Sequence, residues 1–352
     1  MRVLAFPETA DANGNPYVAL LHDRMRAEGI VIDRVSGTRL LSRPDVVHVH
    51  WPEQLVRTDA ARRLAYDAAK LLALIAAARL RGAVLVWTAH NLRPHEPRHQ
   101  RLMDVFLALF VAQVDLVIGL TAASRAPLVA RHPLLRRRPF VVVAHGHYRD
   151  AYVGGERDRA ASRRRLGLAP ARRTLLTLGY VRRYKNIAEL VRAFVSASAT
   201  DAQLAVVGRL GSEALGEEIE AARGDDERVH LRLGAATPQE VVSWHAAADV
   251  VVLAHDTSSS LNSGAALLAL SLDRPVVMPD GPSARELRDQ VGAEWVIAVR
   301  GDAPDLVAAA LTAAAPATSR PALDHLDWAR LARETLAAYE LARERRLRRS
   351  RR

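Results

Sequence analysis

The sequence predicts an α/β protein with two similar domains, each built on a parallel sheet, followed by one further helix. Two observations support this fold class. Short apolar runs alternate with helix-length segments of apolar periodicity along nearly the whole chain, which is the pattern of βαβ units. The chain has 352 residues, which is enough for two such domains, each with its own core.

The first half contains five predicted strands, each a short apolar run bounded by polar residues. They cover residues 3–6, 46–50, 84–88, 116–120 and 140–144. Apolar helices are expected at 65–80 and 102–112, edged by Arg62, Arg63, Lys70, Arg79 and Arg81. A cationic rim on an apolar helix suits peripheral contact with an anionic membrane, although internal helices with arginines at their ends are commoner.

A polar, arginine-rich segment at 149–173 separates the halves and includes a short basic helix closed by Gly167 and Pro170. Strands then recur at 175–178, 204–207, 229–231, 250–253 and 275–278. The last helical pattern, from Trp328 to about Leu341, follows the second set of strands, and we expect it to pack across the cleft between the domains. The predicted boundaries are 1–150 for the first domain, 151–173 for the connection, 174–325 for the second domain and 326–352 for the final helix and its basic tail.

Composition excludes several protein classes. The chain has no cysteine, which excludes disulfides and thiolate metal sites and is compatible with a cytoplasmic protein. We expect neither a signal peptide nor a membrane span, because MRVLAF runs directly into a strand and no apolar segment is long enough. The net charge is +11, and part of it lies in RERRLRRSRR at 343–352, a candidate contact for an anionic membrane. Nucleic acid is a minor hypothesis, because aromatic and basic residues are not interleaved.

The most informative segment is residues 175–194, LLTLGYVRRYKNIAELVRAF. A strand, a glycine turn, a basic loop and a helix follow one another, and such an element holds phosphorylated ligands at the carboxyl edge of a parallel sheet. Arg182 and Lys185 are its candidate cations. Further on, Asn262, Ser263 and Gly264 open another helix, whose N-terminal N–H groups favour an anion. We therefore predict a diphosphate clamp made from these two segments.

Polar residues also follow two predicted strands of the first half. His50 and Glu53 follow the second strand, and His90 and Glu96 follow the third. Ligands bind at the carboxyl ends of such strands, so Glu53, His90 and Glu96 are candidate catalytic residues, whereas His50 is expected to be packed against a backbone partner. No GxSxG motif occurs, so a serine hydrolase is not predicted, and the irregular spacing of the histidines and carboxylates does not favour a metal site.

The whole pattern resembles the GT-B glycosyltransferases, in particular family 4, also called glycosyltransferase group 1. The resemblance rests on five segments: ASRRRLGL at 161–168, LGYVRRYKN at 178–186 with its G-x5-K spacing, LAVVGR at 204–209, the expected helix around 241–247 before ADVVVLA at 248–254, and SGAALLALSLDRPVV at 263–277. It implies two Rossmann-like domains facing a cleft and a C-terminal crossover helix. It also implies that the first domain binds the acceptor and the second binds the nucleotide-sugar donor.

Two residues carry over directly from this resemblance. Lys185 matches the family's diphosphate-binding lysine, and His90 matches its histidine near the donor sugar. The arginine that usually follows the glycine is Tyr180 here, so Arg182 or Arg183 would take its role.

The family's Glu-x7-Glu pair is missing, because its two positions hold Ser260 and Leu268. In its absence Ser260, Asn262 and Ser263 would offer neutral hydrogen bonds to the donor. The missing pair leaves the donor identity open, as well as the choice between retaining and inverting chemistry.

The resemblance implies a metal-independent transferase at the cytoplasmic face of a membrane, with no cofactor besides its donor substrate. It would move a hexosyl unit from a UDP- or GDP-sugar to a glycan precursor, a lipid-linked sugar or a small molecule. Inverting chemistry would need a general base, with Asp11, Glu53, His90 and Glu96 as candidates, and retaining chemistry would need none. Two alternatives stay open: a nucleotide-sugar 2-epimerase of the same fold, and a non-catalytic binding subunit.

Overall fold

The computed structural model describes residues 1–9, 15–36, 39, 43–56, 60–93, 99–255 and 261–350. The chain forms two compact units. The first comprises Met1–Gly146, Ser259–Asn262 and His325–Arg352, and the second comprises His147–Ser258 and Ser263–Asp324. No helix in the described ranges is both long enough and apolar enough to cross a membrane.

The first unit is built on a sheet of parallel strands in the spatial order β2-β1-β3-β4-β5-β6. The strands are β1 (Arg2–Phe6), β2 (Val31–Arg34), β3 (Val46–Val49), β4 (Val84–Ala89), β5 (Leu116–Gly119) and β6 (Phe140–Val142). Strands β3, β4 and β5 are wholly buried, and their sequences VVHV, VLVWTA and LVIG do not alternate with polar residues. Continuous apolar runs are typical of parallel strands that are covered on both faces.

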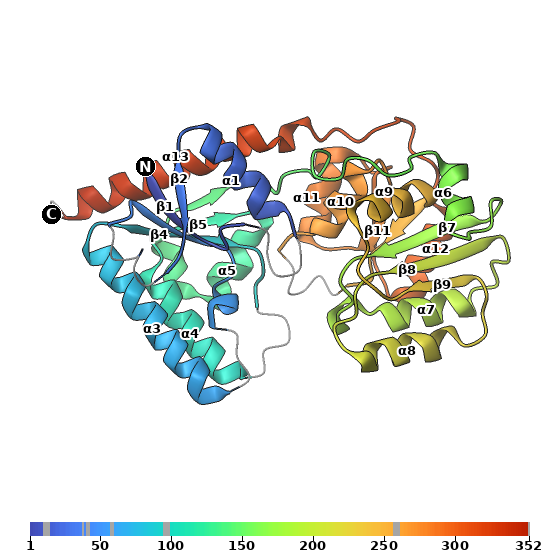
Figure 1. Ribbon diagram of the computed structural model, residues 1–352, viewed down its shortest axis with the longest axis horizontal. Helices are drawn as coiled ribbons and strands as arrows, with labels where there is room; N and C mark the ends of the chain where they lie inside the picture. Colours follow the sequence, from blue (N-terminus) through green and yellow to red (C-terminus); the bar gives the residue numbers. More distant parts are fainter. Residues whose placement is uncertain are drawn as a thin grey trace. The chain divides into compact units, whose positions relative to one another are not determined.

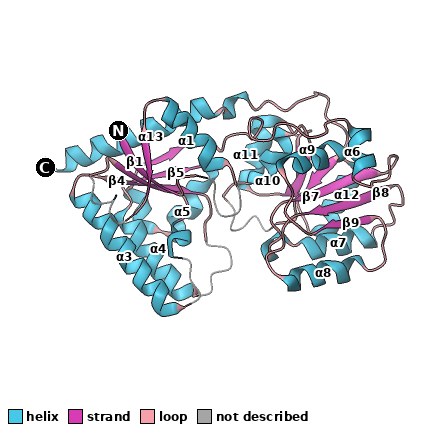
Figure 2. Cartoon of the chain, in the orientation of Figure 1, coloured by secondary structure: helices cyan, strands magenta, loops and turns pink. Residues whose placement is uncertain are grey.

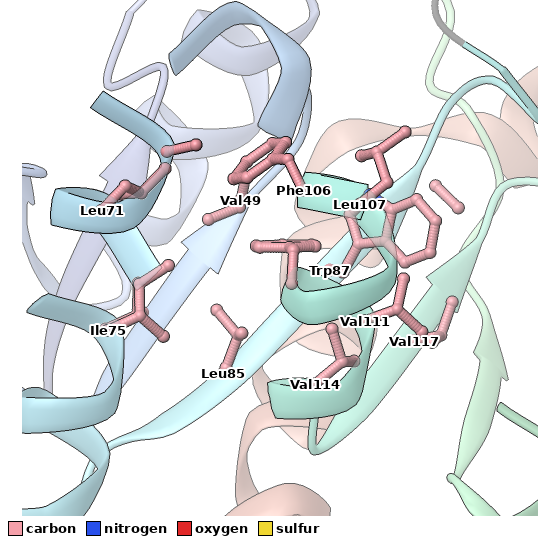
Figure 3. Packing of buried hydrophobic residues seen from close by; sticks show 14 of the residues in the cluster. Val49, Leu71, Ile75, Leu85, Trp87, Phe106, Leu107, Val111, Val114 and Val117 are labelled. Carbon is pink, nitrogen blue, oxygen red and sulfur yellow. The ribbon is translucent and has the colours of Figure 1, made fainter. Parts of the chain in front are cut away.

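Helices cover both faces of this sheet (Figure 1). Helices α1 (Tyr17–Ala27) and α13 (Trp328–Ser350) pack on one face, and α3 (Ala61–Leu80), α4 (Gln100–Gln113) and α5 (Arg125–Arg131) pack on the other. Figure 3 shows the core on the α3 and α4 side, where Ile75, Phe106 and Leu107 lie around Leu85 and Trp87 of β4.

The C-terminal helix α13 belongs to the first unit. Its Tyr339 is fully buried, and the hydroxyl lies 2.6 Å from Nδ1 of His48 in β3. The helix is longer than predicted and reaches Ser350, because arginine favours helices and two tail arginines pair with the unit. Arg343 lies 3.0 Å from Asp45, and Arg346 lies 3.7 Å from Asp115. Part of the predicted basic tail is therefore a docked helix end.

The second unit repeats the architecture of a sheet covered by helices (Figure 2). Its parallel sheet has the strand order β12-β11-β10-β7-β8-β9. Its strands are β7 (Arg173–Leu178), β8 (Ala202–Val207), β9 (Val229–Arg232), β10 (Val250–Val252), β11 (Val276–Pro279) and β12 (Val296–Val299). Its helices are α6 (Arg159–Arg165), α7 (Ile187–Ser196), α8 (Glu213–Arg223), α9 (Pro238–Ala247), α10 (Gly264–Ser271), α11 (Pro282–Val291) and α12 (Ala303–Thr312).

Local sequence explains several of these elements. Helix α7 buries Ile187, Leu190, Val191 and Phe194, which are three and four residues apart and so share one face. The predicted basic helix in the arginine-rich segment is α6. Its buried Arg163 lies 2.7 Å from a carboxylate oxygen of Asp249, which ties this segment to the second unit.

The predicted architecture of two parallel sheets is confirmed, and each predicted strand is present. Two strands were missed, β2 and β12. Both are four residues long, lie at the edge of their sheet and are only partly buried. Short edge strands need not have the long apolar run that marks a central parallel strand.

Candidate active site

In the second unit, the strand order reverses at β7 and β10, because β8 and β9 lie on one side of β7 and β10 to β12 lie on the other. Ligands of parallel sheets bind where the strand order reverses in this way. A small pocket lies at this point. Its lining includes Gly179 and Lys185 after β7, Ala254 and His255 after β10, and Ala265 in the first turn of α10. Of the residues predicted for the clamp, Lys185 lines this pocket, and Ala265 beside it is the residue that follows Gly264.

Lys185 ends the short 3-10 helix η4 (Arg183–Lys185), and its side chain lies over Gly179. A Cβ atom at Gly179 would come within 3.1 Å of the lysine Nζ, and the backbone there has φ +133°, so glycine suits this position. Burial, followed by the neighbouring charge of Arg182, lowers the pKa of Lys185 from 10.5 to about 8. No carboxylate in the described ranges forms an ion pair with this ammonium group. Its charge is therefore available to an anionic ligand.

Tyr180 follows Gly179 and lies next to two guanidinium groups. The Cζ atom of Arg182 lies 4.3 Å from the ring centroid, and that of Arg209 lies 4.8 Å away. Both distances are within the range of cation–π contacts. Arg183 instead forms an ion pair of 3.6 Å with Glu218 on α8. Of the two arginines that the sequence offered as a substitute at position 180, Arg182 is the one beside Lys185.

Helix α10 begins at Gly264, and Ser263 is its N-cap. The Ser263 hydroxyl accepts a hydrogen bond of 3.2 Å from the N–H of Ala266. The first N–H groups of a helix have no partner inside it, and the helix dipole favours an anion there. Asn262 belongs to the first unit, and Ser260 lies outside the described residues.

In the first unit, the strand order reverses at β1 and β3. The 3-10 helix η1 (Pro52–Val56) directly follows β3 and carries Glu53. A second small pocket lies beside the carboxyl ends of β3 and β4, and its lining includes Trp51, Glu53, His90 and Leu107. Two of the three predicted catalytic residues therefore line one pocket, while Glu96 lies outside the described residues.

Glu53 has an unusual titration for a carboxyl group. Burial raises its pKa from 4.5 to about 7, and a hydrogen bond to its own backbone N–H offsets only part of this rise. A carboxyl group with a pKa near 7 can accept a proton at neutral pH and can afterwards release it to solvent. Glu53 is therefore ionised in part at neutral pH.

His90 is buried and neutral. Burial, and then the proximity of His145 and His48, hold its pKa well below the usual value of 6.5. Its ring stacks on Trp51 with a centroid distance of 4.2 Å and an interplanar angle of 24°. Its Nε2 lies 3.1 Å from Nδ1 of His50. The prediction that His50 is packed is right, but the partner of its ring is His90 and not a backbone group.

Three buried histidines of this unit, His22, His48 and His50, lie close enough together to be considered as metal ligands. Both ring nitrogens of His48 are already hydrogen-bonded, Nδ1 to the hydroxyl of Tyr339 at 2.6 Å and Nε2 to Oγ1 of Thr88 at 2.7 Å. Of these three histidines, only His22 and His50 have a ring nitrogen without a partner in the described ranges. Two ligands are fewer than the three or four protein ligands of typical zinc sites, so these side chains do not favour a metal centre.

Comparison with known proteins identifies the family. No protein-family model matches the chain. The chain is 30% identical over 337 residues to GDP-mannose:glycolipid 4-beta-D-mannosyltransferase of Xanthomonas campestris pv. campestris, an alignment that covers 94% of this chain and 89% of the relative. The chain belongs to the GT-B glycosyltransferases. It is an enzyme that transfers a hexosyl unit from a nucleotide-sugar.

Solved structures agree with this glycosyltransferase fold. Anabaena HepE in complex with UDP and glucose is 17% identical, with a TM-score of 0.62, and the match covers 98% of this chain and 95% of that one. Sucrose-phosphate synthase from Thermosynechococcus elongatus is 15% identical, with a TM-score of 0.61, and the match covers 99% and 98%. The resemblance to GT-B enzymes is thus confirmed. The relatives support transfer over the epimerase and binding-subunit alternatives.

One residue near the Lys185 pocket was missed by sequence reasoning. Arg209 ends the motif LAVVGR and follows β8 after Gly208, and β8 is the neighbour of β7 in the sheet. The signal in the sequence was the position of Arg209 at the carboxyl end of a predicted strand, where ligands of parallel sheets bind. Recognising its contact with Tyr180 required the pairing of β7 with β8.

Proposed function

We propose that this glycosyltransferase transfers mannose from GDP-mannose to a glycolipid and inverts the anomeric centre. The observation that carries this proposal is the 30% identity, over 94% of the chain, to an enzyme named for GDP-mannose, a glycolipid acceptor and a β-linked product. The mannosyl bond of GDP-mannose is an α bond. A β product therefore requires inversion, and inversion requires a base for the acceptor hydroxyl.

Glu53 is the proposed base, supported by its position in a pocket and its pKa near 7. The acceptor oxygen forms a bond to C1 of mannose while its proton passes to the Glu53 carboxylate. The bond between C1 and the β-phosphate oxygen breaks, and its electron pair leaves with GDP. His90 is neutral and lines the same pocket, so its proposed role is to hydrogen-bond a sugar hydroxyl.

The leaving group is proposed to bind at the pocket of the second unit. Lys185, Arg182 and the first turn of α10 supply positive charge and N–H donors there. Their charge offsets that of the departing diphosphate, so no metal ion and no other cofactor is part of the proposal. Ser263 caps α10 and keeps its first turn in place.

We also propose that the first unit rests on the inner, cytoplasmic face of a membrane. On α4, Leu102, Val105 and Leu109 are exposed and lie three and four residues apart, so they form one apolar stripe. Arg101 at the start of α4 is exposed, and Arg138 binds the main chain at its end. Basic side chains around an apolar stripe suit an anionic lipid surface. The opposite face of α4 contributes Leu107 to the Glu53 pocket, so the proposed membrane contact and this pocket share one helix.

Incubation with GDP-mannose and a lipid-linked saccharide tests the activity. The expected result is release of GDP that depends on the acceptor, with a β-mannosyl product by NMR. An α-linked product, or transfer from UDP-glucose but not from GDP-mannose, would contradict the proposal.

Sedimentation with vesicles tests the membrane contact. Binding to vesicles that contain phosphatidylglycerol should fall when Leu102, Val105 and Leu109 are all replaced by serine. Unchanged sedimentation of this variant would remove α4 from the proposal.

A further inference from the structure

We infer that Arg209 binds the diphosphate of the donor and that the ring of Tyr180 holds Arg209 in position. The inference rests on the proposed function, because it requires a nucleoside diphosphate at the Lys185 pocket. It concerns Tyr180, which stands where the family usually has an arginine, and Arg209, which contacts the ring of Tyr180.

The backbone brings the two residues together in a fixed arrangement. Strands β7 and β8 continue to hydrogen-bond beyond their last residues: the N–H of Val181 donates to the carbonyl of Arg209 at 2.9 Å, and the N–H of Gly211 donates to that of Val181 at 2.8 Å. Gly208 lies directly against Gly179, since a Cβ atom at Gly208 would lie 1.8 Å from the Gly179 carbonyl oxygen. The segments that carry Tyr180 and Arg209 therefore form one closely packed double loop.

The ring of Tyr180 orders Arg209 without neutralising its charge. An exposed arginine usually samples many rotamers, and fixing it costs conformational entropy. A carboxylate partner would restrict the side chain but would also cancel its charge. An aromatic ring provides a contact for the guanidinium and leaves the full positive charge for a ligand. Arg209 is exposed, and its side chain forms no ion pair with any carboxylate in the described ranges.

The position of Arg209 also suits the proposed ligand. The ring that Arg209 contacts also contacts Arg182, whose charge is close enough to Lys185 to lower the pKa of that lysine. Three cationic side chains thus gather around Gly179 and Tyr180. A diphosphate carries enough negative charge to interact with all three, and guanidinium groups bind phosphate oxygens with two N–H donors.

Calorimetric titration of the full chain with GDP, and with guanosine as the phosphate-free probe, tests this inference. Arg209→Ala should weaken GDP binding by about 10- to 100-fold, the usual contribution of charged hydrogen bonds. Guanosine binding should change by less than about twofold, because guanosine has no phosphate. The matched control is Arg288→Ala, which removes an exposed arginine from α11 of the same unit.

Tyrosine variants test the positioning role. Tyr180→Leu should weaken GDP binding by about 3- to 10-fold and leave guanosine binding unchanged, because the cation–π contacts are lost. Tyr180→Phe keeps the ring face and should recover most of the GDP affinity. If Tyr180→Phe is as weak as Tyr180→Leu, the ring is not the platform and this part of the inference is wrong.

The outcomes separate this inference from the proposed function. If the unsubstituted enzyme binds no nucleoside diphosphate, the proposed function fails. If it binds GDP and Lys185→Ala weakens that binding, but Arg209→Ala binds GDP as tightly as the Arg288→Ala control, the proposed function stands and the role of Arg209 is refuted.

Discussion

Replacement of Glu53 by glutamine should slow the enzyme and stabilise the fold at the same time. Glutamine has nearly the same size and shape but cannot accept a proton from the acceptor. A general base contributes about 10²- to 10⁴-fold to a rate, so kcat should fall by that factor. The unsubstituted enzyme should lose activity below about pH 7, because burial raises the pKa of Glu53 to about 7 and the base is then protonated. This acid limb should be absent from the residual activity of Glu53→Gln.

The gain in stability follows from the same pKa. In the unfolded chain the carboxyl ionises near 4.5, and in the folded enzyme near 7. The folded state therefore binds more protons than the unfolded state between these values, so Glu53 lowers the free energy of unfolding as the pH rises through this range. Each pKa unit corresponds to about 1.4 kcal/mol, which gives a cost of up to about 3 kcal/mol at about pH 8. Glutamine does not ionise and avoids this cost.

Two measurements check this prediction. Release of GDP gives kcat across the pH range, and urea unfolding at about pH 4.5 and about pH 8 gives the stability difference. Glu340→Gln is the matched control, because Glu340 is an exposed glutamate on α13 of the same unit. The reasoning is refuted if Glu53→Gln retains the rate of the Glu340→Gln control, or if it is no more stable than this control at the higher pH.

Three further predictions concern other parts of the structure. The affinity for GDP should fall as the pH rises through about 8, because the ammonium of Lys185 then loses its proton, and titrations of Lys185→Ala should lack this step. Gly208→Ala should lower the free energy of unfolding by about 2–4 kcal/mol, because the added methyl group clashes with the carbonyl of Gly179. Gly224→Ala is the control and should lower the free energy of unfolding by only about 1 kcal/mol, because no atom lies within 4 Å of its added methyl group. Tyr339→Phe should lower the free energy of unfolding by about 1–3 kcal/mol, because the buried Nδ1 of His48 loses its hydrogen-bond partner. An unchanged midpoint of urea unfolding would contradict this reasoning.

Sequence reasoning succeeded where the signal is local. The segment around Lys185 combines a strand, a glycine and a helix within twenty residues, and the structure places it at the reversal of the strand order. Glu53 and His90 were proposed because each follows a predicted strand, and parallel strands bring their carboxyl ends to one edge. The structure places both residues in one pocket, while their chemical roles stay predictions.

Other properties depend on contacts between distant residues and leave no local signal. The raised pKa of Glu53 results from burial, which only the packed unit produces. The contact between Tyr180 and Arg209 depends on the register of β7 and β8. The partner of His50 lies forty positions along the chain, in the loop after the neighbouring strand β4. Edge strands such as β12 are missed because they are short and only partly buried.

The path of the chain has a consequence for how the protein is made. The first unit needs α13, since Trp328 and Tyr339 fill its core, yet the whole second unit is translated between Gly146 and this helix. A ribosome therefore releases most of the first unit long before the helix that covers one face of its sheet. Until α13 has been synthesised, the apolar side chains of β1, β3 and α1 that pack against this helix stay exposed to solvent. A fragment that ends at Gly146 should aggregate, and the second unit is the better choice for expression alone.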